Sequence, residues 1–224
     1  IKRVYLSTNG LGLDSSWLER FRREPKGVLT ISLDGGPEYM RKYRRSPKGT
    51  VDPYDHLMAL LPELVAPPRV VVSQTIAPAG ANEAASNFEH LRSLGFWRFN
   101  LLPGYFLPWR RQQLVALRQS FAAIREHIVE AWRNKQRFYL RNLFTWAPTP
   151  FVNTGLVVDA DRSIHPSNAS LCGLLADLHR HTRLGSLDNP PSEDSLRQAS
   201  ALMPDLLRRH LSEEIWSSTL AADA

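Results

Sequence analysis

The stretch from Val28 to Gly35 constrains the fold of this chain more than any other. It reads Val-Leu-Thr-Ile-Ser-Leu-Asp-Gly, with Pro25 and Gly27 before it and a further glycine and a proline after it. A short apolar run of this kind, bounded by such residues, predicts a strand buried on both faces, as in parallel sheets. Parallel α/β folds place their chemistry at the carboxyl ends of such strands. We therefore expect a parallel sheet with a binding site near Ser32.

The pattern of an apolar strand followed by a helix occurs four times in the first 133 residues. The expected strands cover residues 4–6, 28–33, 70–76 and 96–102. Asp14, Ser15 and Ser16 are candidate N-caps of the first helix and Asp52 is expected to cap another, and the longest helix carries an apolar stripe from Leu114 to Ile128. Such alternation implies parallel strands joined by right-handed crossovers. The fold class is therefore α/β, and the pattern is compatible with both an open sheet and a barrel.

Composition excludes several classes of protein. At 224 residues and 43% hydrophobic, the chain can bury a core of its own. It contains neither an apolar run of roughly 18 residues nor a signal-peptide pattern at its start, so we expect a soluble cytoplasmic protein without a membrane partner. The formal charge of +6 is accompanied by no nucleic-acid-binding motif, so no nucleic-acid partner is expected. The single cysteine, Cys172, excludes a disulfide and a multi-cysteine metal or iron–sulfur site built from this chain alone.

Three short motifs follow one another with strands and helices between them. They are Thr8-Asn9-Gly10, Ser32-Leu33-Asp34-Gly35 and Tyr43-Arg44. In this order they resemble the second part of a radical S-adenosylmethionine (SAM) domain. The resemblance implies a partial (β/α) barrel of the TIM type, of which this chain supplies the third to sixth units. Enzymes of this family hold a 4Fe–4S cluster on a CxxxCxxC loop after their first strand, and the resemblance implies that such a loop precedes this chain.

The same resemblance implies which residues bind the cofactor. Ser32 and Arg44 match positions that hold the carboxylate of SAM in the family, and Thr8 and Asn9 lie at the tip of a neighbouring strand. A hydroxyl and a guanidinium suit this role because both donate hydrogen bonds to a carboxylate. The chain departs from the family at Met40-Arg41, where His-Asp often precedes the Tyr-Arg pair.

Further polar residues are candidates for the same site. Gln74, Thr75 and Asn100 end the next strands and are expected at a common mouth. Asp34 precedes a glycine, which favours a turn-forming role. The histidines indicate structural or surface roles, because no set of them has the spacing of a metal site. No metal ligand is therefore assigned.

The chain changes character after Arg133, so we expect one domain over residues 1–133 and a C-terminal extension over residues 134–224. A β-hairpin is expected over residues 156–166, and two amphipathic helices from Ser192 onward. The hairpin resembles the SPASM extension that follows many radical SAM barrels, where a Pro-Cys binds an auxiliary cluster. Ser167 stands in place of that cysteine, so the resemblance implies an extension without cluster ligands.

The resemblance implies a fragment of a radical SAM protein. The intact parent would cleave SAM at a 4Fe–4S cluster and abstract hydrogen from a substrate, often a peptide or protein, whereas this chain alone is expected to be inactive. Two other functions stay open: an α/β enzyme without a cluster, and a non-catalytic degenerate barrel that binds a peptide or metabolite. Because barrel units are expected to be missing beside Val4, self-association through that strand edge is also expected.

Overall fold

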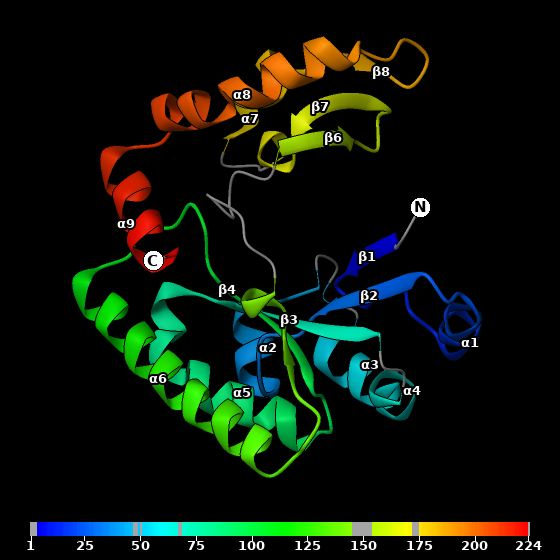
Figure 1. Cartoon of the computed structure of the whole chain (residues 1–224), viewed down its shortest axis with the longest axis vertical. Coiled ribbons are helices and arrows are strands. Elements are labelled where there is room, and N and C mark those ends of the chain that lie inside the picture. The colour runs from blue at the N-terminus through cyan, green and yellow to red at the C-terminus, as the bar shows by residue number, and fades with distance from the viewer. Residues whose placement is uncertain are drawn as a thin grey trace. The chain divides into compact units, whose positions relative to one another are not determined.

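The computed structural model describes residues 4–46, 49, 51–66, 69–144, 154–171 and 175–223. In chain order the first elements are β1 (Val4–Thr8), α1 (Ser15–Arg23), β2 (Gly27–Ser32), α2 (Pro37–Tyr43), α3 (Pro53–Ala59), α4 (Leu61–Val65), β3 (Val70–Ile76), the 3-10 helix η1 (Pro78–Glu83), α5 (Ala84–Ser93), β4 (Arg98–Pro103), α6 (Arg111–Arg133), β5 (Tyr139–Leu140) and η2 (Arg141–Leu143). The remaining ones are β6 (Thr154–Val158), β7 (Ser163–Ser167), η3 (Asn168–Leu171), α7 (Ala176–Thr182), β8 (Gly185–Ser186), α8 (Glu193–His210) and α9 (Glu213–Asp223) (Figure 1).

The chain forms two compact units. Unit 1 consists of residues 1–104 and 110–145, and unit 2 consists of residues 105–109 and 146–224. The short segment 105–109, which joins β4 to α6, therefore packs with the C-terminal part of the chain. Within the described residues, no helix is long and apolar enough to cross a membrane.

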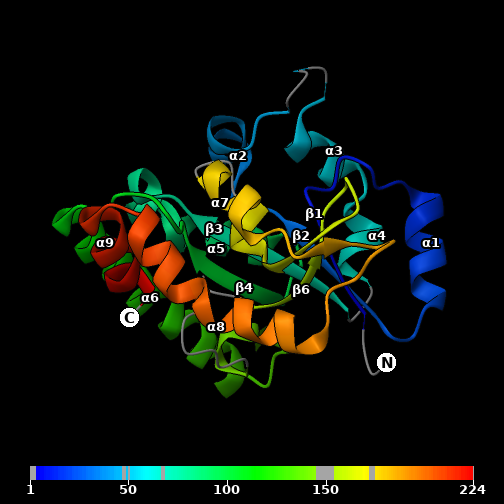
Figure 2. The ribbon, with the colours of Figure 1, turned by 90° about the horizontal axis from the view of Figure 1, so that it is seen from above.

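Unit 1 is built on a five-stranded parallel sheet with the order β1-β2-β3-β4-β5. The four strands expected from the sequence are its first four strands, so the α/β class and the parallel pairing are confirmed. Helices α1 to α6 contribute to a core on one face of this sheet (Figures 1 and 2). The core includes Leu29, Ile31, Phe88 and Phe99, all fully buried. Apolar residues at every second strand position produce this face, because side chains alternate along a strand.

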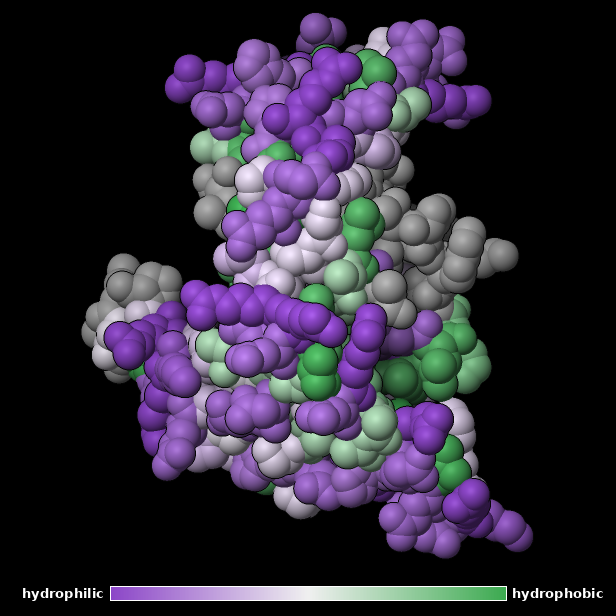
Figure 3. Space-filling view, turned by 90° about the vertical axis from the view of Figure 1, so that its left-hand side faces the viewer, coloured by the Kyte–Doolittle hydropathy of each residue, from purple (hydrophilic) through white to green (hydrophobic). Residues whose placement is uncertain are grey.

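Local signals in the sequence begin two helices where they were expected. The side chain of Asp14 accepts a hydrogen bond from Trp17 N at the start of α1, and that of Asp52 caps α3. Helix α6 buries one stripe that includes Leu117, Ile124 and Ile128. The face of the molecule that carries α6 is mostly hydrophilic (Figure 3), as the amphipathic pattern requires.

The sheet of unit 1 is strongly curved. β1 and β5 lie at its opposite edges, yet the guanidinium carbon of Arg141, just after β5, lies 5.2 Å from the ring centroid of Tyr5 in β1. Only a curved sheet can bring its two edges this close. The described strands leave the sheet open, because β1 pairs with β2 and β5 pairs with β4.

Unit 2 contains a three-stranded antiparallel sheet with the order β6-β7-β8. The expected hairpin is present, since β6 pairs with β7, and Arg162 in its turn adopts a positive φ of 70°. The two expected C-terminal helices are α8 and α9, and Ser192 caps α8. Ser167, at the position of the family's cysteine, is fully buried and accepts a hydrogen bond from Ala169 N. Cys172 lies outside the described residues.

His165 in β7 is fully buried inside a polar network. Its Nε2 lies 2.9 Å from Ser163 Oγ and its Nδ1 lies 3.3 Å from Thr182 Oγ1. The ring of His179 lies 4.5 Å away, centroid to centroid, and His179 Nε2 lies 3.3 Å from Asp159 Oδ2. Burial, and next the neighbouring His179, lower the pKa of His165, although nearby carboxylates act in the opposite direction.

We expect acid to destabilise unit 2 through His165. Because its pKa is lowered in the folded chain, the unfolded chain takes up this proton more readily below about pH 6.5. Stability that is present above that pH is therefore lost as the pH falls toward the folded pKa. Thermal unfolding followed by circular dichroism between pH 8 and 5 should show this loss, and His165→Gln should remove most of it. The exposed His181, replaced in the same way, is the control, and an unchanged pH dependence in His165→Gln would contradict the expectation.

Candidate functional site

Ser32, Ser73 and Asn100 form a polar row across the three middle strands of unit 1. Ser32 is the register partner of Ser73, and Ser73 is that of Asn100. Their chain neighbours Leu33 and Leu101 lie in the helix-side core, so these three side chains point to the opposite face of the sheet. Ser73 is buried and the other two are half-buried. Their side chains form no hydrogen bond to another described residue, so water or a ligand on this face would supply their partners.

A charge pair lies at the carboxyl ends of β2 and β3. Arg44 donates from Nε to Asp34 Oδ2 at 2.5 Å, and from Nη2 to Asp34 Oδ1 at 3.2 Å and Thr75 Oγ1 at 3.3 Å. Asp34 Oδ1 also accepts a hydrogen bond of 2.7 Å from Thr75 N. The Asp34 carboxylate thus joins the two strands beyond their last paired residues. The interpretation of Asp34 as a turn-forming residue is wrong, because its side chain bonds Thr75 in β3 and Arg44, which directly follows α2.

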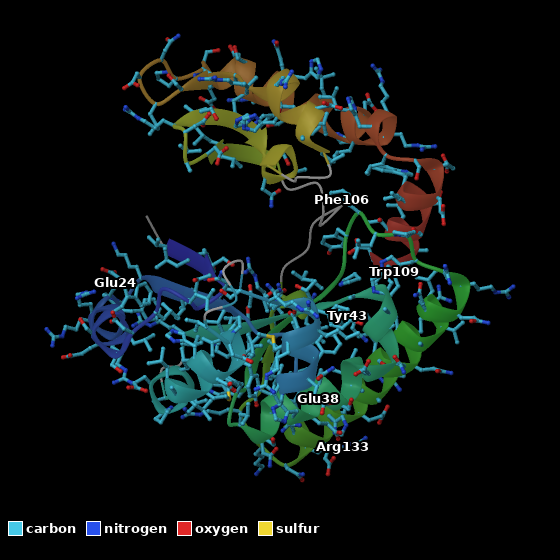
Figure 4. The ribbon with its side chains drawn as sticks, turned by 180° about the vertical axis from the view of Figure 1, so that it is seen from behind. Glu24, Glu38, Tyr43, Phe106, Trp109 and Arg133 are labelled. Carbon is cyan, nitrogen blue, oxygen red and sulfur yellow. The ribbon has the colours of Figure 1, made fainter. Side chains whose placement is uncertain are left out.

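Burial dominates the electrostatics of this pair. The Asp34 side chain is 4% exposed, whereas that of Arg44 is 28% exposed. Burial raises the pKa of Asp34, while the hydrogen bond and the positive charge of Arg44 act to lower it. Tyr43, labelled in Figure 4, directly precedes Arg44 at the end of α2, and its buried hydroxyl has no hydrogen-bond partner among the described residues.

The other two residues assigned to the cofactor shape the turn after β1. Thr8 Oγ1 accepts a hydrogen bond of 3.1 Å from Gly10 N, and Asn9 Oδ1 accepts one of 3.2 Å from Leu11 N. Of the four assigned residues, only Ser32 has a side chain without a hydrogen bond to a described residue. The Nη1 nitrogen of Arg44 likewise forms no such bond.

The strand register changes the assignment on β3. Gln74, expected at the mouth, is 1% exposed and donates from Nε2 to Ala84 O at 3.0 Å, on the helix side of the sheet. The expectation for Gln74 is wrong because side chains alternate, and Ser73 takes the place beside Ser32. Sequence reasoning missed Ser73. Aligning the strands by their buried positions would have found it.

The turn after β2 is packed too closely for a side chain. A Cβ atom on Gly35 would lie 2.0 Å from Asn87 Oδ1, the atom that accepts a hydrogen bond from Gly36 N at 3.0 Å. Glycine is therefore required for the close approach of α5 to this turn. Asn87 therefore holds the turn that follows Asp34, while Arg44 bonds the Asp34 carboxylate.

The residues of this site suit SAM better than they suit an iron–sulfur cluster. Hydroxyl, amide and guanidinium groups can donate hydrogen bonds to a carboxylate. A 4Fe–4S cluster is held by cysteine thiolates, and the chain contains one cysteine. In the part of the chain that the structure describes, no three His, Cys, Asp or Glu side chains gather as a metal site would require.

Solved structures share this fold. An anaerobic sulfatase-maturating radical SAM enzyme, anSMEcpe with bound AdoMet (SAM), has 15% sequence identity and a TM-score of 0.67, covering 88% of this chain and 57% of that chain. The same enzyme with AdoMet and the Kp18Cys peptide has the same identity, coverage and TM-score. With AdoMet and the Cp18Cys peptide, the identity is 14% and the TM-score is 0.67, and the match covers 96% of this chain and 59% of that chain. No family model and no curated protein matches the chain.

These matches define the class of fold. The chain has a radical SAM-like α/β fold, as its parallel sheet and covering helices already indicated. It spans 57% to 59% of the length of the solved chains it resembles. The activity of those enzymes is therefore only a proposal for this chain.

Proposed function

We propose that this chain is the SAM-positioning part of a radical SAM protein and that it binds SAM on the face of the sheet that carries Ser32, Ser73 and Asn100. The observation that carries the proposal is this row of polar side chains without hydrogen-bond partners among the described residues, beside the Asp34–Arg44 pair. The likeness to a structure with bound AdoMet supports it.

The proposal gives each residue a role. The Ser32 hydroxyl donates a hydrogen bond to the carboxylate of SAM. Arg44 attracts the same carboxylate and can bond it through Nη1, because Nε and Nη2 are engaged by Asp34 and Thr75. Thr8 and Asn9 hold the turn at the tip of β1, where the ligand is expected to end.

The parent protein, in this proposal, takes hydrogen from a peptide or protein substrate after SAM cleavage at a cluster held by residues outside this chain. A peptide partner is supported by the two related structures that contain peptides. This chain has one cysteine and does not supply that cluster, so we expect no turnover from it alone. Unit 2 is proposed as a SPASM-like extension without cluster ligands, in keeping with the serine at position 167.

One observation favours a second function, that of a non-catalytic peptide-binding module. Unit 2 has an open groove of about 300 Å³ lined by apolar Leu184, Leu202 and Leu206 and by polar His181 and Gln198. Apolar and uncharged polar side chains together suit a short peptide. Peptide binding without any SAM binding would support this function over the first.

Calorimetric titration with SAM and S-adenosylhomocysteine tests the proposed function. We expect weak binding of both, and a loss of about tenfold in affinity for Ser32→Ala, since a hydrogen bond to a charged group contributes about 1.5 to 3 kcal/mol. Ser86→Ala is the matched control, because Ser86 is exposed and bonds Glu83 O on the helix side. Absence of binding in the unaltered chain, or equal losses in both variants, would contradict the proposal.

A further inference from the structure

The segment that leaves β4 is held by the last helix of the chain. Tyr105 donates from its hydroxyl to Asp223 Oδ1 at 3.1 Å, and Ser218 Oγ donates to Leu107 O at 3.4 Å. Both Asp223 and Ser218 belong to α9. Trp109, at the other end of the segment, is 5% exposed. Figure 4 labels two of the three aromatic residues of this segment, Phe106 and Trp109.

Phe106 is the anchor of this segment. Its side chain packs against the apolar core of unit 2, which consists of Ala169, Leu175, Leu178, Met203, Leu207 and Leu211 with Ile215 and Trp216 beside them. Its backbone has a φ of 61°, a conformation that a bulky side chain rarely adopts. Such a strained conformation persists only where the surrounding contacts stabilise it. Here the packing of the Phe106 ring stabilises it.

The anchored segment begins at the strand end that carries part of the candidate site. Gly104 N donates to Ile76 O at 2.8 Å, so the backbone is tied to β3 up to that residue. Asn100 lies four positions earlier in β4. The backbone is therefore bonded to the sheet of unit 1 as far as Gly104, and the residues that follow it, 105–109, pack within unit 2.

We propose that α9 is a strap that clamps the connection between β4 and α6 through Phe106 and the Tyr105–Asp223 hydrogen bond. Burial raises the pKa of Asp223, and burial together with the nearby Asp223 raises that of Tyr105, so their hydrogen bond forms in a partly buried setting, where it is stronger than in water. Displacement of α9 should release residues 105–109, and displacement of residues 105–109 should destabilise α9 in turn, because coupling between two sites is reciprocal.

Hydrogen–deuterium exchange of the full chain, without any ligand, tests the strap. In Phe106→Ala we expect the amides of residues 105–109 and those of α9 to exchange about tenfold faster or more, although α9 itself is unaltered. Tyr105→Phe should speed both regions by a smaller factor while the rest of unit 2 keeps its protection. Asp223→Asn keeps an acceptor oxygen and should stay close to the unaltered chain, whereas Asp223→Ala should resemble Tyr105→Phe.

Phe144→Ala is the control, because Phe144 is an aromatic residue that is 67% exposed and lies outside the strap. Unchanged exchange in α9 for both Phe106→Ala and Tyr105→Phe would overturn the proposal. Faster exchange throughout unit 2, including β7, would overturn it as well, since Phe106 would then act as a general core residue. The outcome is independent of SAM binding, so the strap and the proposed function can fail separately.

Discussion

Replacing Arg44 with alanine is expected to lower the free energy of unfolding by about 2 to 3 kcal/mol. The change leaves the carboxylate of Asp34 buried without its charge partner, and removing one partner of a fully buried pair costs about 3 to 5 kcal/mol. The expected loss is smaller here because the Arg44 side chain is 28% exposed. Urea denaturation measures this loss directly.

The decrease in unfolding free energy caused by Arg44→Ala should be smaller at low pH than at neutral pH. The pKa of Asp34 is already raised by burial, and Arg44→Ala removes the hydrogen bond and the charge that act to lower it. A raised folded pKa means that the variant gains stability from a proton on Asp34 at low pH and loses that stability as the pH rises through the folded pKa. The gap between the variant and the unaltered chain should therefore be smaller near pH 4 than at pH 7.

Two further variants distinguish the stabilisation by the Asp34–Arg44 pair from the general effect of removing a positive charge. Arg45→Ala removes an adjacent, exposed arginine whose Nε bonds Arg41 O, and we expect a change within about 0.5 kcal/mol. Asp34→Asn combined with Arg44→Ala should be less destabilised than Arg44→Ala alone, because no buried charge is left unpaired. Equal losses in Arg44→Ala and Arg45→Ala would show that the buried pair does not stabilise unit 1.

The 224-residue chain is also expected to self-associate through β1. Val4, Tyr5 and Leu6 are 44%, 55% and 41% exposed, whereas the residues of β2 and β3 are mostly buried. Among the described strands β1 pairs with β2 alone, so its other edge offers unpaired backbone donors and acceptors. A second copy fits this edge, because two β1 strands related by a two-fold axis can pair antiparallel.

Sedimentation equilibrium at several protein concentrations measures this association. Leu6→Lys places a charge on the exposed edge and should weaken association by about tenfold or more, since lysine blocks strand pairing at sheet edges. Val115→Lys is the control, because Val115 is 47% exposed on α6, away from the sheet edge. A monomer at every concentration of the unaltered chain would refute this expectation.

The repeated pattern of strand and helix was sufficient to predict unit 1 in outline. The strand at residues 28–33 could be located because a short run of apolar and β-branched residues bounded by glycine and proline is typical of a buried strand. The hairpin of unit 2 was recognisable from two short stretches separated by the turn at residues 160–162. The site was predicted only in part, because Ser32 could be placed by its position at a strand end, whereas the faces of Gln74 and Ser73 depend on register.

Local sequence by itself determined the class of fold, since propensity, periodicity and capping act over a few residues and Asp14 and Asp52 cap the helices they precede. Only the tertiary structure decided which partners the polar residues have. The pairing of Arg44 with Asp34 and Thr75, and the capture of residues 105–109 by α9, join segments far apart in the chain. Such contacts arise from the curvature of the sheet and the packing of whole elements, which no short stretch of sequence encodes.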